Sequence, residues 1–307
     1  MRNSSQGILV VVGPTASGKT AFAHEFARKY GGEIINADSR QVYRFLDIGT
    51  AKPTTLQQQQ VRYHLLDRVE PNEIFTLGQF LEEAKIAISE TRYRGAIPIV
   101  VGGTGQYIHA LVSGWKPPNV TPNPMLRTEL SSLTIEDLHA KLASVDPISA
   151  ANIHPNNVRR VIRALEVYYT LQKPFSSFQN PVSVEDRFVC LGLEVDQTTL
   201  DQTIAKRIEG MLAVGWQSEI EKLLRAGYAA SSPGFSSLGY RSLIRVIRGD
   251  MLLETAIAAI QTQTKQLARR QNQWFSPRRL EITLNRVDAI DMESLYNRVI
   301  NCPLARD

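Results

Sequence analysis

An eight-residue loop near the start of the chain limits its possible folds more than any other feature. Residues 13–20 read Gly-Pro-Thr-Ala-Ser-Gly-Lys-Thr, directly after the apolar run at 8–12 and before a segment whose apolar residues recur at helical spacing. This is the pattern G-x-x-x-x-G-K-[ST] in the strand, loop and helix context that gives the pattern its meaning. The loop therefore predicts an α/β fold with a phosphate site at the end of its first strand.

The residues of this loop suit an anion for separate physical reasons. Glycine backbone can wrap a phosphate so that successive N–H groups point inward, and the N-terminus of the following helix adds partial positive charge. Lys19 supplies a full charge, and the Thr20 hydroxyl would reach a Mg²⁺ ion. We expect the whole loop to line the phosphate site: Gly13, Pro14, Thr15, Ala16, Ser17, Gly18, Lys19 and Thr20.

The first third of the chain alternates between strand and helix patterns. A short strand-like segment at 33–37 and the apolar run at 97–101 are separated by a segment with helical periodicity. Such alternation is typical of a doubly wound parallel sheet, whose ligands bind at the carboxyl ends of the strands. Gly13, Asp38 and Gly102 each follow a predicted strand, so we expect them at one edge of the sheet.

A proline-rich segment indicates a domain boundary. Residues 116–124 contain four prolines, which cannot continue a helix or a central strand. The pattern is helical from 125 to 171, and a strand-like run then precedes further helical stretches at 198–226 and 252–274. We predict a P-loop NTPase-like parallel-sheet core interrupted by a small all-helical insertion domain, with the core at 1–115 and 187–307 and the insertion at 116–186.

Composition excludes several classes of protein. Cys190 and Cys302 show no C-x-x-C or Cys/His spacing, which excludes a disulfide framework and a zinc ribbon. No apolar run approaches the roughly 20 residues of a membrane span, and residues 1–7 lack the apolar core of a secretory signal. We expect a cytoplasmic monomer without membrane contact. The net charge of +5 permits a polyanionic partner without requiring one.

The strand at 97–101 lacks one feature of a nucleoside triphosphatase. Such enzymes usually carry an acidic residue at the end of a neighbouring strand, where it holds metal and water, whereas this strand ends in Gly-Gly-Thr-Gly at 102–105. Asp38 is the carboxylate at a suitable strand end, although an aspartate in that position could equally cap a turn. The motifs alone leave open whose phosphate the loop holds.

Eight sequence blocks, in order along the chain, resemble those of one enzyme family. They are GPTASGKT at 13–20, DSRQVY at 38–43, LDIGTAKP at 46–53, YHLLD at 63–67, GGTGQY at 102–107, HPNN followed by RRVIRALEV between 154 and 167, LGY at 238–240 and QLARRQNQWF at 266–275. Their order is similar to that of the tRNA dimethylallyltransferases, also called isopentenyl-tRNA transferases. The similarity extends over residues 13–275, nearly the whole chain.

The resemblance implies prenyl transfer. A dimethylallyl group would pass from dimethylallyl diphosphate to the N6 of the adenosine just 3′ of the anticodon, in tRNAs that read codons beginning with U. The loop at 13–20 would hold the diphosphate with Mg²⁺, so no acid is needed after the strand at 97–101. The family pattern gives catalytic roles to Asp38 as the base for the N6 proton, to Arg207 as a diphosphate ligand and to Thr104 near the reacting nucleotide.

The resemblance also implies contacts with the tRNA anticodon stem-loop from both predicted domains, because the target base must leave its stack. The candidate contacts in the core are Asp38, Ser39, Arg40, Gln41 and Thr104. Those in the insertion are Arg127, Arg159, Arg160 and Arg163. The basic segment at 261–280, which contains Trp274, is left open as a further contact.

Departures from the family pattern and two rival activities remain. Thr203 stands where the family often has an arginine, and Ser276 where a basic residue is usual. One rival is an adenylate isopentenyltransferase, which prenylates free AMP, ADP or ATP and needs no insertion for a stem-loop. The other is a P-loop small-molecule kinase. A non-catalytic GTPase-like RNA-binding module ranks last, because the guanine-specifying N-K-x-D is absent.

Overall fold

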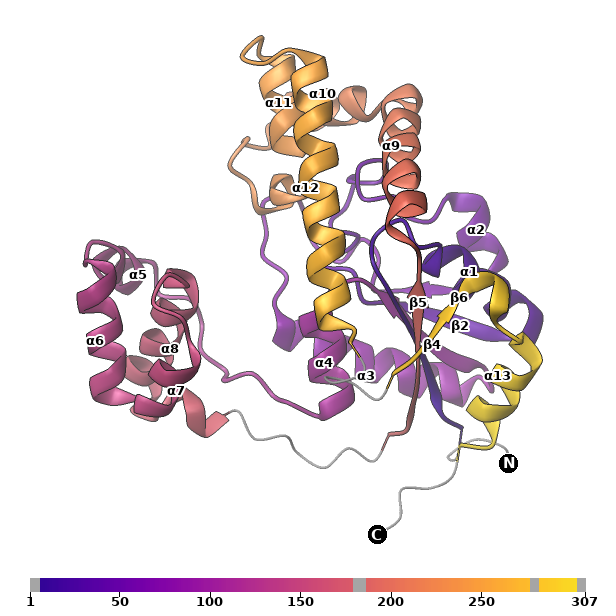
Figure 1. Cartoon of the computed structure of the whole chain (residues 1–307), viewed down its shortest axis with the longest axis horizontal. Coiled ribbons are helices and arrows are strands. Elements are labelled where there is room, and N and C mark those ends of the chain that lie inside the picture. The colour runs from indigo at the N-terminus through magenta and orange to yellow at the C-terminus, as the bar shows by residue number, and fades with distance from the viewer. Residues whose placement is uncertain (1–5, 179–185, 277–281, 303–307) are drawn as a thin grey trace. The chain divides into compact units, whose positions relative to one another are not determined.

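The computed structural model describes residues 6–178, 186–276 and 282–302. The chain divides into two compact units. Figure 1 shows the whole chain coloured by residue number. The first unit comprises Met1–His109 with Glu185–Asp307, and the second is Ala110–Val184. The insertion was predicted to begin at residue 116, whereas the division falls a few residues earlier, inside a helix.

The first unit is built on a parallel sheet. Among the described residues the strand order is β3-β2-β4-β1-β5-β6, and each pair of neighbours runs parallel. Every residue of β1 is buried, as expected for a strand covered on both faces. The predicted α/β fold is therefore confirmed. The strands are β1 (Ile8–Val12), β2 (Gly32–Asn36), β3 (Tyr63–His64), β4 (Ile97–Gly102), β5 (Phe188–Glu194) and β6 (Ile282–Arg286).

Helices α1 and α13 cover one face of this sheet. Leu9 and Val11 of β1 share a buried cluster with Phe22 and Phe26 of α1 and with Leu295 of α13. The helices of the first unit are α1 (Lys19–Tyr30), α2 (Thr55–Gln60), α3 (Leu77–Tyr93), α9 (Gln197–Val214), α10 (Trp216–Arg225), α11 (Tyr240–Ile247), α12 (Leu253–Trp274) and α13 (Met292–Ile300), and α4 (Gly105–Ser113) crosses into the second.

Helices α9 to α12 pack together around a second core, as Figure 1 shows for α9, α10, α11 and α12. Trp216 and Tyr240 are almost fully buried in it, and their rings meet edge to face at 5.7 Å. Val42 and Leu46, from the segment after β2, belong to the same cluster. The helices are therefore anchored to the chain that follows a carboxyl end of the sheet.

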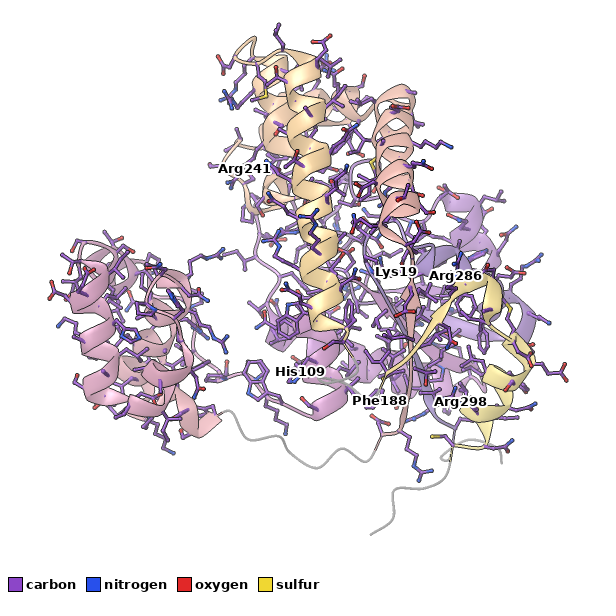
Figure 2. The ribbon with its side chains drawn as sticks, in the orientation of Figure 1. Lys19, His109, Phe188, Arg241, Arg286 and Arg298 are labelled. Carbon is purple, nitrogen blue, oxygen red and sulfur yellow. The ribbon has the colours of Figure 1, made fainter. Side chains whose placement is uncertain are left out.

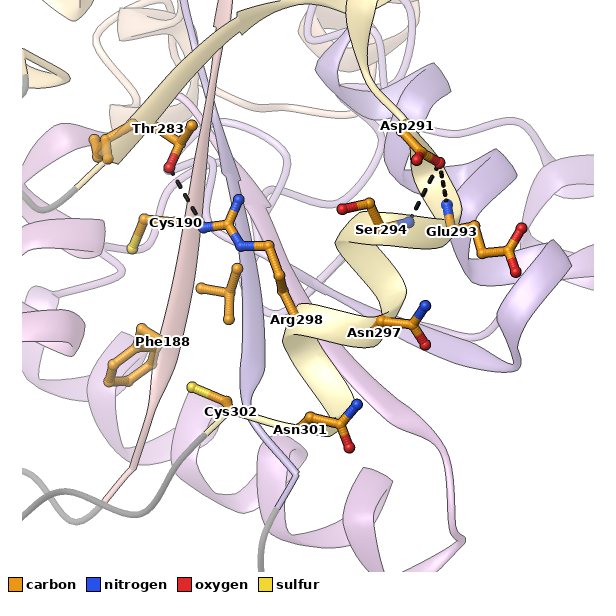
Figure 3. A pocket seen from close by; sticks show the side chains of 12 residues that line it. Phe188, Cys190, Thr283, Asp291, Glu293, Ser294, Asn297, Arg298, Asn301 and Cys302 are labelled. Atoms are coloured by element: carbon orange, nitrogen blue, oxygen red, sulfur yellow. Dashed lines mark hydrogen bonds between the residues drawn. The ribbon is translucent and has the colours of Figure 1, made fainter.

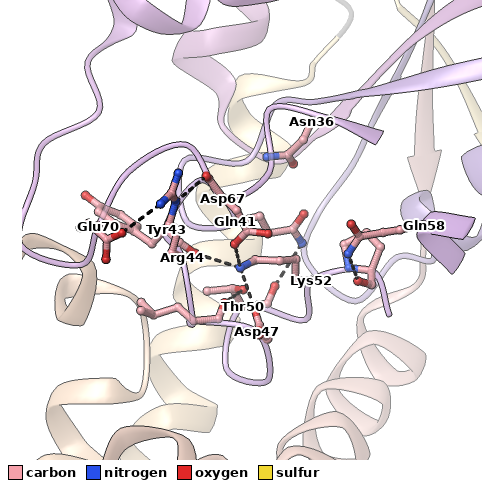
Figure 4. Close-up of polar contacts among 12 residues, drawn as sticks. Asn36, Gln41, Tyr43, Arg44, Asp47, Thr50, Lys52, Gln58, Asp67 and Glu70 are labelled. Carbon is pink, nitrogen blue, oxygen red and sulfur yellow. Dashed lines mark hydrogen bonds and ion pairs between the residues drawn. The ribbon is translucent and has the colours of Figure 1, made fainter. Parts of the chain in front are cut away.

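Lys52 holds this segment in shape. Its Nζ donates to the carbonyl of Tyr43 at 2.9 Å and to carboxylate oxygens of Asp47 and Asp67, as Figure 4 shows. The Lys52 side chain is only 2% exposed, so this buried cation is compensated by two carboxylates and a carbonyl. Glu219 of α10 accepts from the N–H groups of Asp47 and Ile48, which ties the same segment to the helices.

Helices are the only regular secondary structure among the described residues of the second unit. Leu138, Leu142, Val161 and Leu165 form its core, at the spacings that place them on one face of their helices. Its helices, besides the end of α4, are α5 (Pro124–Ser131), α6 (Ile135–Val145), α7 (Pro147–Asn152) and α8 (Val158–Leu171).

The structure differs from the predicted elements in a few places. The helical stretch at 198–226 is broken by Gly215, whose φ of 108° ends α9 and begins α10. Strand β6 and helix α13 were not predicted. Among the described residues, no helix combines the length and apolar content needed to cross a membrane.

Candidate active site

The loop at 13–20 is held in an unusual backbone path. Ala16 and Gly18 have φ values of 66° and 83°, in the left-handed region. The carbonyl of Pro14 accepts from the Ser17 N–H at 3.2 Å and from Lys19 Nζ at 3.1 Å. Gly13 has no room for a side chain, because a Cβ there would lie 3.0 Å from the carbonyl oxygen of Leu193 on β5.

This loop leaves several hydrogen-bonding groups without a protein partner. The Ser17 hydroxyl is buried and unpaired, and within the described residues the N–H groups of Ala16 and Gly18 have no recorded acceptor. The first N–H groups of α1 are also unsatisfied, as at every helix start. A buried unpaired polar group costs about 1–3 kcal/mol. These donors are therefore arranged for an anion.

Charged side chains from three segments meet at this loop. Burial lowers the pKa of Lys19 to about 8; the Asp38 carboxylate opposes this shift, and Arg207 adds to it. Burial also lowers the pKa of the Arg207 guanidinium, again opposed by Asp38. Lys19, labelled in Figure 2, lies in the first turn of α1, while Arg207 comes from α9. The structure thus brings together the three charged residues predicted for catalysis and diphosphate binding.

Asp38 follows β2 and is held by its own neighbours. Its N–H donates to Oδ1 of Asn36 at 3.2 Å, and its Oδ1 accepts from the Arg40 N–H at 2.8 Å. Asn36 is fixed in turn by donation to the Leu65 carbonyl. Among the described residues no donor is recorded for the second carboxylate oxygen of Asp38. That oxygen is available to a ligand.

Thr104 joins the turn after β4 to the segment after β2. Its Oγ1 accepts from the Ser39 N–H at 3.0 Å, and its own N–H donates to the Ala37 carbonyl at 3.3 Å. The two strand ends approach closely, since a Cβ at Gly102 would lie 2.1 Å from the Ala37 carbonyl oxygen. This contact explains why the turn begins with glycine.

The C-terminal end of α12 packs on the Gly-Gly-Thr-Gly turn at 102–105. A Cβ at Gly105 would lie 2.4 Å from Cγ of Trp274, and the Trp274 ring meets His109 edge to face at 6.2 Å. Gln271, one turn earlier, is buried and bonded to both Thr15 and Gly103. Sequence reasoning missed Gln271. Its signal was a polar residue on the buried face of an otherwise apolar helical pattern.

Two residues predicted to contact tRNA from this unit have partners within it. Gln41 is buried, and its Nε2 donates to the carbonyls of Thr50 and Ala51 at 3.1 Å. Arg40 is exposed, and its Nη1 donates to the Ser236 hydroxyl at 2.8 Å. The structure therefore uses Gln41 to fold the segment after β2, while the Arg40 side chain is open to a partner. The predicted RNA contacts themselves stay predictions.

The four arginines predicted to bind tRNA from the second unit fall into two pairs. Arg127 and Arg163 both bond the carboxylate of Glu166, at 2.8 and 2.6 Å. Glu166 is fully buried, and hydrogen bonds from both arginines outweigh the effect of that burial and hold its pKa at about 2. Arg159 and Arg160 are exposed on α8, and no ion pair is recorded for either in the described part of the chain.

A cavity of about 1080 Å³ lies elsewhere in the first unit, between the starts of β5 and β6 and helix α13. Figure 3 shows Arg298 in it, donating to the Thr283 hydroxyl at 3.4 Å, and Asp291 accepting from the first N–H groups of α13. These contacts stabilise α13 and its strand. The cavity is at the opposite end of β5 from the loop at 13–20, so it is separate from the candidate site.

Comparison with known proteins places the chain in a family. A family model described as IPP transferase matches residues 41–279. A tRNA dimethylallyltransferase of Roseiflexus sp. is 42% identical over 291 residues, which cover 93% of this chain and 95% of the relative. One from Chloroflexus aurantiacus is 44% identical over 272 residues, covering 87% and 92%.

Two solved structures are similar over almost the whole chain. The tRNA isopentenylpyrophosphate transferase of Staphylococcus epidermidis is 33% identical with a TM-score of 0.67, and the match covers 96% of this chain and 97% of that one. A eukaryotic dimethylallyltransferase described as acting on tRNA is 26% identical with a TM-score of 0.84, covering 99% and 82%. With a family model that matches most of its length and relatives above 40% identity, this chain belongs to the IPP transferase family.

Proposed function

We propose that this protein transfers a dimethylallyl group from dimethylallyl diphosphate to the N6 of the adenosine just 3′ of the anticodon of tRNA, in tRNAs that read codons beginning with U. The relatives that it matches are named tRNA dimethylallyltransferases. The observation that carries the proposal within this chain is the loop at 13–20, where the buried Ser17 hydroxyl has no partner among the described residues and Lys19 lies within electrostatic reach of Asp38 and Arg207.

The loop at 13–20 is suited to bind the diphosphate as it leaves the prenyl donor. In a displacement at the allylic carbon, the bond from carbon to the bridging oxygen breaks and negative charge collects on the leaving group. Preorganised donors at that position lower the barrier. Such donors are the Ser17 hydroxyl and the N–H groups of Ala16 and Gly18, which have no acceptor among the described residues, together with the cations Lys19 and Arg207.

The Asp38 carboxylate is suited to act as the general base. The N6 amine of adenine is a weak nucleophile because its lone pair is delocalised, so removal of its proton as the new N–C bond forms assists the attack. The Asp38 carboxylate has one oxygen held by the Arg40 N–H and one that accepts from no donor in the described part of the chain. That oxygen would accept the N6 proton, and it would select adenine over a guanine O6, which has no hydrogen to donate.

The residues present also fit a Mg²⁺ ion bound with the diphosphate. Among the described residues no group of three or more His, Cys, Asp or Glu side chains is placed to hold a metal, so an all-protein metal cage is not indicated. Magnesium commonly takes few protein ligands and completes its shell with phosphate oxygens and water. The Thr20 hydroxyl would be its protein ligand, and the ion would supply charge neutralisation at the leaving group.

Contacts with tRNA are supported most directly by Arg159 and Arg160. Both are exposed on α8 without a recorded acidic partner in the described chain. Unpaired arginines of this kind bind phosphates and release counterions. Arg127 and Arg163 are both ion-paired to the buried Glu166, so we expect these two residues to stabilise the second unit more than they bind RNA.

One experiment separates this function from its nearest rival. The protein is incubated with dimethylallyl diphosphate and Mg²⁺, and with equal concentrations of an anticodon stem-loop and AMP, and both acceptors are weighed by mass spectrometry. The proposal predicts that a five-carbon group is added to the stem-loop. Addition to AMP alone would assign the chain to the adenylate-specific activity instead.

A further inference from the structure

Gln271 is a buried amide on α12 that bonds two segments of the candidate site at once. Its Oε1 accepts from the Thr15 N–H at 2.7 Å, and its Nε2 donates to the Gly103 carbonyl at 2.9 Å. Gln271 is only 7% exposed, so water competes weakly for either bond. A side chain with a donor and an acceptor at its tip is required for this pair of contacts.

The bond to Thr15 orients a peptide group that also contacts Lys19. The Thr15 N–H and the Pro14 carbonyl belong to one planar peptide and point in opposite directions. Gln271 holds the N–H end, while the carbonyl end accepts from Lys19 Nζ at 3.1 Å and from the Ser17 N–H at 3.2 Å. Rotation of this peptide would withdraw the carbonyl from Lys19, so Gln271 fixes the position of the lysine indirectly.

The bond to Gly103 reaches the segment that carries Asp38. Gly103 precedes Thr104, and Thr104 accepts from the Ser39 N–H at 3.0 Å, next to Asp38. Gln271 therefore connects two groups of residues with different proposed roles. One group holds the leaving diphosphate, and the other carries the base.

The backbone around Gln271 is shaped to admit it. A Cβ at Gly103 would lie 2.2 Å from Gln271 Nε2, far inside contact distance. The obstructing atom is the end of a flexible side chain, so a methyl group at residue 103 would displace the amide and leave the fold in place. The chain thus offers a second way to break the same bridge.

We propose that Gln271 is a positioning residue for prenyl transfer, whose two hydrogen bonds keep the diphosphate-binding loop and the Asp38 segment at a fixed spacing. This inference rests on the proposed function for its catalytic consequence. Glutamate at this position would still accept from Thr15, but it would lose the bond to Gly103 and add a charge that repels diphosphate.

The test replaces Gln271 with methionine, which has similar length and no amide. We expect the Kd for inorganic diphosphate with Mg²⁺ to rise about fivefold and kcat to fall about tenfold, the scale of one or two lost neutral hydrogen bonds. The Kd for the stem-loop should stay within about twofold, because no tRNA contact is removed. Gln59→Met, at an exposed position of α2 outside the candidate site and the predicted tRNA contacts, is the matched control and should change none of these values.

Gly103→Ala and the double variant make the test decisive. The single Gly103→Ala variant should reproduce the loss of diphosphate affinity, and the double variant should be no worse than either single one, since both remove one shared bridge. Wild-type values in both single variants, or losses that multiply in the double variant, would overturn the inference. If Gln271→Met does not fold, the Gly103→Ala variant decides alone.

Diphosphate binding is measured without prenyl transfer, so this inference and the proposed function can fail separately. A wild-type protein that binds diphosphate but prenylates nothing would refute the proposed function.

Discussion

Thr104 and Ser39 join two parallel strands at the point where both end, through a bond of 3.0 Å from the Ser39 N–H to the Thr104 hydroxyl oxygen. The bond fixes the chain next to Asp38 by a residue that lies 65 positions away in sequence. This bond gives a geometric reason for a threonine in the G-G-T-G turn at 102–105, because the Thr104 hydroxyl oxygen is the acceptor. Any substitution that removes its hydroxyl should disturb the aspartate without touching the phosphate-binding loop.

Thr104→Val tests this relationship, because valine keeps the shape of the side chain and removes the acceptor. The Ser39 N–H would lose its partner, which costs about 1–3 kcal/mol when such a group is buried. We expect a lower kcat with little change in diphosphate affinity, measured by steady-state kinetics and calorimetry. Thr104→Ser, which keeps the hydroxyl, should restore most of the activity; equal losses in both variants would show that the hydroxyl is not the important group.

Asp38→Asn removes the proposed base and keeps its fold. Asparagine still offers an oxygen to the Arg40 N–H, which bonds Asp38 Oδ1 at 2.8 Å in the native chain. Because general base catalysis contributes about 10²–10⁴-fold, we expect kcat to fall by at least about 100-fold with the stem-loop Kd preserved. Turnover close to that of the native protein would remove Asp38 from the mechanism.

Lys19 should make diphosphate binding depend on pH. Burial lowers its pKa to about 8, and an anion binds the charged form, so the bound state has the higher pKa. Affinity should therefore be greatest below pH 8 and fall as the pH rises through this value. Calorimetry of Lys19→Ala provides the control: its affinity should be weaker and should change with pH only as the ligand itself titrates. Parallel pH profiles for the two proteins would show that Lys19 does not bind the diphosphate.

Arg159 and Arg160 should account for part of the salt dependence of tRNA binding. Each phosphate contact contributes about 0.7–0.9 to the slope of log K against log salt, so the double alanine variant should flatten that slope by about 1.4–1.8. Arg28→Ala with Lys85→Ala, two exposed cations on α1 and α3, removes the same charge from the sheet unit. If both pairs change the slope equally, the effect is one of net charge and not of contact.

The sequence predicts those parts of the candidate site whose positions depend on neighbouring residues and on the topology of a parallel sheet. The loop at 13–20 lies between a strand and a helix, Asp38 follows β2 and Gly102 ends β4, and the carboxyl ends of these parallel strands lie at one edge of the sheet. Their convergence follows from that topology alone. Arg207 reaches the site from α9, and its assignment needed the family resemblance because the register of a helix on a sheet edge is not encoded locally.

Contacts between distant polar residues are the part that the sequence does not predict. Gln41 is buried against the carbonyls of Thr50 and Ala51, and Glu166 pairs with Arg127 from another helix. Each partner is an ordinary polar residue whose choice depends on the packing of separate elements. The bridge made by Gln271 is of the same kind, since its partners Thr15 and Gly103 lie 256 and 168 positions before it in the sequence.

The central claim is that the loop at 13–20 binds the leaving diphosphate of a prenyl donor and does not catalyse phosphoryl transfer. Product stoichiometry tests it most directly, in a reaction that contains labelled dimethylallyl diphosphate, ATP, Mg²⁺ and the anticodon stem-loop. The account predicts one diphosphate released for each prenylated adenosine, with ATP unchanged. Conversion of ATP to ADP while the labelled donor stays intact would contradict it.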